Sequence, residues 1–109
     1  MAYFKSGVPA TRFTWTAPTA NVDGSPISGD LAYNLYVDGG VMASFPGTLN
    51  ADGTYEVLFV DLPSFPVGEA SFTLTAFYTS NPGAESVESG AVLVEYRQIP
   101  LAPILFGAD

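Results

Sequence analysis

The stretch "LAYNLYVDGGVMASF" (residues 31–45) decides the fold class, because it has the pattern of two strands joined by a tight turn. In its first half every second residue is large and apolar, namely Leu31, Tyr33, Leu35 and Val37. Side chains alternate between the two faces of a strand, so this spacing predicts a strand with one buried face. Asp-Gly-Gly at 38–40 is a turn signal, and a second apolar segment follows at 41–45. The stretch therefore predicts a β-hairpin.

Short apolar segments also occur on both sides of this hairpin. They cover residues 12–17, 54–62, 71–80 and 91–97, and most of the Gly and Pro residues fall between them. This punctuation is typical of an all-β protein, and no segment has the period of an amphipathic helix. Six strands at this spacing predict a β-sandwich. The alternation places four aromatic side chains on inward faces: Phe13, Trp15, Phe59 and Phe72.

The composition limits what the protein can bind. A chain of 109 residues is one domain, and its charged fraction of 13% is roughly half of that expected for a soluble domain. Eleven Asp and Glu residues stand against three cations, which gives a net charge of −8. Nucleic acid is therefore excluded as a partner, because three scattered cations cannot form a basic track. A surface with so few charges is typical of extracellular or assembly-bound β proteins.

The chain has no cysteine, no signal-peptide pattern and no apolar run of transmembrane length. We therefore expect no disulfide, no thiolate metal site and no membrane partner. If Met1 is the natural start, the protein is expected to work inside the cell or as part of a particle such as a virion.

Catalytic chemistry has few side chains available, because the sequence contains neither His nor Cys. The aspartates lie at expected turns and strand ends, where they cap backbone groups, so we expect no enzyme and no cofactor. Two loops, "NVDGSPISGD" (21–30) and "NADGTYE" (50–56), offer oxygen ligands to calcium. Neither has an alternating run of ligands, and Asp-Gly turns are the favoured interpretation.

Several segments, taken in order, resemble a fibronectin type III domain, a member of the immunoglobulin-like sandwiches. "FTWTAP" (13–18) resembles strand B with its buried tryptophan, and "LAYNLYVDG" (31–39) is similar to strand C. "VDLP" (60–63) resembles the end of strand E, and "FTLTAFYTSNPGAESVESGAVLV" (72–94) resembles strands F and G with a Glu-Ser-x-x-Ser element between them. The resemblance implies an all-β fibronectin type III or immunoglobulin-like β-sandwich of about seven strands.

Two features depart from this family pattern. The tyrosine that begins strand F is missing, since its place falls near Ala70, and we expect Phe65 to pack underneath instead. Strand A is weak, because "YFKSGVP" (3–9) leaves few residues before the tryptophan strand. The first edge of the sheet is therefore expected to be poorly filled.

Two groups of side chains are candidates for contacts with other molecules. The first is an apolar protein interface formed by Leu58 and Val60, on the second face of segment 54–62, together with Leu101, Ile104, Leu105 and Phe106. The second is a surface aromatic patch formed by Tyr36, Phe77, Tyr78 and Tyr96. Exposed aromatic rings anchor protein contacts and also stack on sugars.

The chain divides into a sandwich, residues 1–97, and an extended apolar tail, residues 98–109. No charge lies between Arg97 and Asp109, and two prolines interrupt the tail. Leu101 to Phe106 is expected either to fill the strand-A edge of a neighbouring subunit or to dock in a partner's groove. Packing along its own sandwich is an equal alternative.

These features favour a non-enzymatic structural or assembly module that acts through protein–protein contacts. We expect a bacteriophage virion protein, a capsid decoration or tail component, which forms homo-oligomers with other virion proteins as partners. The alternative is an adhesive or carbohydrate-binding accessory module of a secreted bacterial protein, located outside the cell or on its surface. A fold alone does not decide between them.

Overall fold

The computed structural model describes residues 2–4, 9–63, 65–97, 100, 102–104 and 107–108. Its regular structure is almost entirely β, as predicted. The elements are β1 (Ala2–Phe4), β2 (Pro9–Ala10), β3 (Arg12–Trp15), β4 (Leu31–Val37), β5 (Gly40–Phe45), β6 (Thr48–Leu49), β7 (Tyr55–Leu58), the 3-10 helix η1 (Phe59–Asp61), β8 (Gly68–Tyr78) and β9 (Val92–Tyr96). No helix in the described ranges has the length and hydropathy needed to span a membrane.

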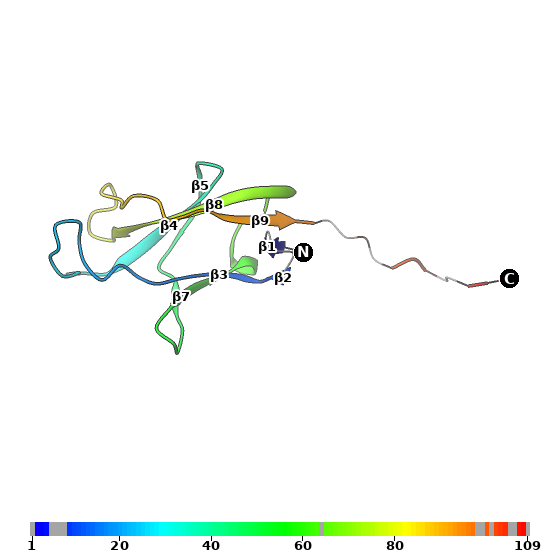
Figure 1. Ribbon diagram of the computed structural model, residues 1–109, viewed down its shortest axis with the longest axis horizontal. Coiled ribbons are helices and arrows are strands. Elements are labelled where there is room, and N and C mark those ends of the chain that lie inside the picture. Colours follow the sequence, from blue (N-terminus) through cyan, green and yellow to red (C-terminus); the bar gives the residue numbers. More distant parts are fainter. Residues whose placement is uncertain are drawn as a thin grey trace.

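The strands form two antiparallel sheets that face each other (Figure 1). The larger sheet has the order β2-β1-β9-β8-β4-β5, and the smaller one has the order β3-β7-β6. The predicted hairpin is confirmed, because β4 pairs with β5 and the turn residues Asp38 and Gly39 both have positive φ, 48° and 88°. A two-residue turn of this kind matches the twist of the flanking strands.

The core lies between the two sheets and is rich in aromatic rings. Phe13 of β3 lies 5.1 Å from Phe72 of β8 and 4.7 Å from Phe59, between ring centroids. These three rings are buried, and Trp15 is half-buried with its ring 4.9 Å from that of Tyr33. The predicted inward faces are therefore confirmed. Burial of one such ring stabilises the fold by about 1.5–3 kcal/mol.

Phe65, from the loop before β8, packs on one end of this core, as the sequence predicts. Its ring centroid lies 4.9 Å from Phe59, 5.4 Å from Phe72 and 6.0 Å from Tyr96. Ala70 of β8 is buried in the same core. A phenylalanine from the loop before β8 thus fills the core beside Ala70, as expected from the sequence.

The expected strand over 54–62 is wrong in its second half. β7 ends at Leu58, and Phe59–Asp61 forms a turn of 3-10 helix, so Val60 does not lie on a sheet face. The helix lets Phe59 enter the core while Val60 remains exposed. A segment that is apolar on both sides does not reveal such a break by alternation.

The N-terminal strands join the larger sheet. β1 pairs antiparallel with β9, with Tyr3 opposite Glu95, and β2 pairs with β1. The chain then crosses at Thr11 into β3 of the smaller sheet. The strand expected at the first edge is short, as predicted, and its partner is β9.

Candidate protein-interaction site

β3 has an edge without a partner in the described part of the chain. On one side Phe13 lies opposite Val57 of β7. The carbonyl of Thr11 accepts a hydrogen bond from the Phe59 amide at 2.9 Å. Because bonded residues alternate along an antiparallel ladder, the backbone groups of Arg12 and Thr14 are directed to the opposite side. Such unpaired groups are a template for another strand.

An apolar groove of about 180 Å³ lies beside this edge. It is bounded by β3 on one side and by β8 and the start of β9 on the other. Its lining residues are Phe13, Thr14, Trp15, Leu35, Phe72, Thr73, Leu74, Ser89, Gly90 and Val92. Core side chains therefore continue to the surface at this point, and Val92 is 39% exposed at the margin.

The groove exists because β1 covers only part of β9. β1 pairs with residues Val94, Glu95 and Tyr96, so Val92 and Leu93 have no strand partner on that side among the described residues. The unpaired part of β9 and the unpaired edge of β3 border the same groove. The indole Nε1 of Trp15 is also buried without a hydrogen-bond partner in the described structure. Buried donors of this kind are rare in native proteins.

Two serines hold the loop before β9 against β8, and one of them, Ser89, lines the groove. The Leu74 amide donates to Ser89 Oγ at 3.0 Å, and the Ser89 amide donates to the Leu74 carbonyl at 2.9 Å. Ser86 makes the same pair of bonds to Ala76, at 2.9 and 2.8 Å. These are the serines of the Glu-Ser-x-x-Ser element, whose spacing was noted from the sequence but whose role was missed. They hold the loop along β8 where β9 has not yet begun.

Glu85 fixes the same loop on the outer face of the larger sheet. The Thr75 and Tyr36 hydroxyls each donate to Glu85 Oε2 at 2.6 Å. These bonds, that from Thr75 first, hold the pKa of Glu85 below its usual value, and the bond to Glu85 raises the pKa of Tyr36. The ionised carboxylate of Glu85 is therefore the form that holds the loop against the larger sheet.

Replacement of Tyr36 by phenylalanine is expected to raise the pKa of Glu85 towards the ordinary glutamate value. The bonds favour the ionised carboxylate, so the stability that they contribute is present above the unfolded-state pKa and is lost as the pH falls through the lower folded-state pKa. A pH titration of the Glu85 side chain by NMR measures this change. Tyr78→Phe is the control, and an equal pKa shift in both variants would contradict the assignment.

The structure does not gather the four predicted aromatics into one patch. Tyr36 and Phe77 lie on the outer face, as their register across β4 and β8 shows. The Tyr78 hydroxyl donates to Asn21 Oδ1 at 2.6 Å and accepts a bond from the Ser28 amide at 3.2 Å. Tyr96 lies apart from these three: it is half-buried, shares the inward face of β9 with buried Val94 and packs on the core.

The predicted apolar interface is exposed where the structure describes it. Leu58 is 39% exposed, Val60 87% and Ile104 88%. Leu101, Leu105 and Phe106 lie outside the described residues. Sequence reasoning missed further exposed apolar side chains on loops and edges, namely Val22, Val41, Leu49, Val67 and Val87. A lone valine in a turn gives no periodic signal.

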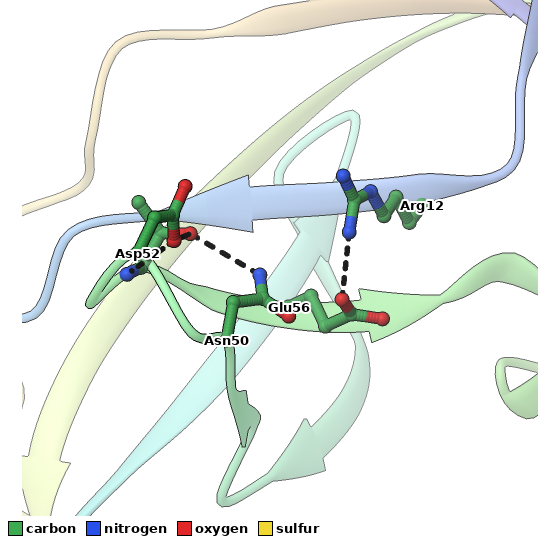
Figure 2. A network of polar contacts seen from close by, with 5 residues as sticks. Arg12, Asn50, Asp52 and Glu56 are labelled. Atoms are coloured by element: carbon green, nitrogen blue, oxygen red, sulfur yellow. Dashed lines mark hydrogen bonds and ion pairs between the residues drawn. The ribbon is translucent and has the colours of Figure 1, made fainter.

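The two loops considered for calcium each contain a turn, and the two turns have the same hydrogen-bond pattern. Asp52 Oδ1 accepts bonds from the Thr54 amide and hydroxyl, at 3.0 and 2.7 Å, which lower its pKa, and Asn50 Nδ2 donates to Thr54 Oγ1. Asn21, Asp23 and Ser25 repeat this arrangement. Figure 2 shows the turn of Asn50 and Asp52 beside the ion pair between Arg12 and Glu56, whose length is 2.7 Å. Within the described ranges, no three acidic side chains gather to hold a metal ion.

Comparison with protein-family models, with curated proteins and with solved structures finds no match to this chain. The sequence pattern, the sheet order and the β3 groove are therefore the basis of the functional proposal.

Proposed function

We propose that this chain is a non-enzymatic structural module that assembles through protein–protein contacts. The observation that carries the proposal is the free edge of β3 beside the apolar groove. Natural proteins cover or charge such edges, because an open edge with apolar surface beside it joins other chains. Here the groove has mainly apolar walls, and an assembly partner would cover them.

We also propose a fibronectin type III or immunoglobulin-like arrangement for the sandwich. The neighbours β5-β4-β8-β9 correspond in order to strands C′-C-F-G, and β3-β7-β6 corresponds to strands B-E-D. In this assignment the edge of β3 is the one at which strand A would lie. β1, which pairs with β9, leaves that place open.

The setting that we propose is a bacteriophage particle, as a capsid decoration or tail component. It is supported by the sparse charge of the chain and by several exposed valines, which suit a surface that neighbouring subunits cover. Glycan binding, the alternative, would rely on Tyr36 and Tyr78. Both hydroxyls already bond within the chain, to Glu85 and Asn21, and this favours the assembly role.

Light scattering of the full chain over a range of concentrations tests the assembly role. We expect the mass to rise above the 11.5 kDa of one chain as the concentration increases. Because each copy carries a net charge of −8, repulsion opposes association at low ionic strength, and added salt is expected to strengthen it. A constant monomer mass at every concentration and ionic strength would contradict a self-assembling module.

A further inference from the structure

We propose that residues 101–106 of a second copy of this chain add a strand to the free edge of β3 and fill the groove beside it. This inference rests on the proposed assembly function and names its contact. Strand addition to an open sheet edge takes affinity from backbone bonds and specificity from pockets for alternate side chains. β3 offers both, since its unpaired edge and the apolar groove adjoin.

The tail is the part of the chain best suited to this place. It has no charge between Arg97 and Asp109, whereas the whole chain carries −8. An uncharged apolar segment can enter an apolar groove of another copy without bringing a like charge close to it. The described tail residues Pro100, Ala102, Pro103 and Ile104 are all exposed, so they are available to a partner.

The occupant is a second copy, because the tail leaves β9 at the end away from the groove. Val92 lines the groove, whereas Tyr96 and Arg97 lie at the other end of β9, and in Figure 1 the coloured parts of the tail lie beyond this end, away from the sheets. A return along the edge of β9 would meet β1, which already pairs with Val94 to Tyr96. Groove and tail are different surfaces, so their contact is heterologous and joins copies in a row or a ring.

Proline sets the register of the added strand. Every strand pair in the described structure is antiparallel, and we assign the same sense here. Pro103 has no N–H, so its backbone nitrogen cannot donate to β3 and must face away from it. Pro103 therefore lies opposite a β3 residue such as Phe13, whose own backbone groups are used in pairing with β7. Residues directly opposite share a face. Leu101 and Leu105 then point into the groove, and Ile104 points outward.

Two sets of full-chain variants test the two halves of the contact. Leu101→Asp with Leu105→Asp places two charges on the inserted face, and Ala102→Asp with Ile104→Asp, which places two charges on the opposite face, is its matched control. Gly90→Leu adds a bulky side chain to the wall of the groove, since Gly90 lines it and a Cβ there would clash with nothing within 4 Å. Gly83→Leu is its control, since Gly83 is equally open and does not line the groove. The tail variant keeps the test decisive even if Gly90→Leu affects the fold.

We expect the tail double variant and Gly90→Leu each to weaken association about 100-fold, while the two controls associate like the original chain. Mixed together, the two defective variants should form a dimer that grows no further, because one keeps an intact groove and the other an intact tail. Sedimentation velocity reads all of these masses. Unchanged association of the variants, or a mixture that stays monomeric, would overturn the inference. If the original chain associates and the variants associate equally well, only the tail contact is contradicted and the proposed assembly function stands. If the original chain never associates, the proposed assembly function is itself contradicted.

Discussion

Replacing Phe72 with alanine is expected to lower the free energy of unfolding by about 3–5 kcal/mol. Phe72 is 1% exposed, and its ring packs against Phe13 across the sheets and against Phe65 below. Its removal takes away one of the ring contacts that join the sheets and leaves a cavity that this small core cannot refill. Denaturation in urea or guanidinium chloride measures the loss.

Phe77→Ala is the matched control for this prediction. Phe77 is half-buried on the outer face of the same strand, so its loss should cost clearly less than that of Phe72. Equal costs for the two substitutions would show that Phe72 does not hold the two sheets together.

Replacing Gly47 with alanine is expected to destabilise the protein by about 2–4 kcal/mol. Gly47 has φ of 75°, in the left-handed region, and a Cβ there would lie 2.6 Å from Cζ2 of Trp15. The substitution therefore adds backbone strain and pushes on the indole, which itself packs beside Tyr33 and Tyr55. The same denaturation experiment reports the change.

Gly53→Ala separates these two causes. Gly53 has φ of 88° but open space around a Cβ, so only the backbone cost of about 1 kcal/mol applies. If Gly47→Ala cost no more than Gly53→Ala, close packing of Trp15 on Gly47 would not contribute to stability.

The parts of the fold that sequence predicted are those with strong local patterns. Alternation over residues 31–37 and a turn signal that requires positive φ fixed the hairpin, and the rings of Phe13 and Phe72 followed from the same period of two. The packing of Phe65 on the core was predicted because the sequence has no tyrosine near Ala70, where the family pattern places one.

The rest depends on long-range pairing, which local pattern does not encode. Nothing in residues 2–4 shows that β1 pairs with β9 rather than with β3, because both choices suit a short apolar segment. The groove could not be predicted from the sequence either, because its presence depends on where β1 stops along β9.

Amide hydrogen exchange at Thr14 tests the central claim, that copies of this chain join at the edge of β3. In the isolated copy the Thr14 amide is directed to the unpaired edge, whereas Phe13 pairs with Val57. Exchange at Thr14 should therefore slow as the protein concentration rises, with that of Phe13 slow throughout. Fast exchange at Thr14 in a sample whose mass has increased would contradict the claim.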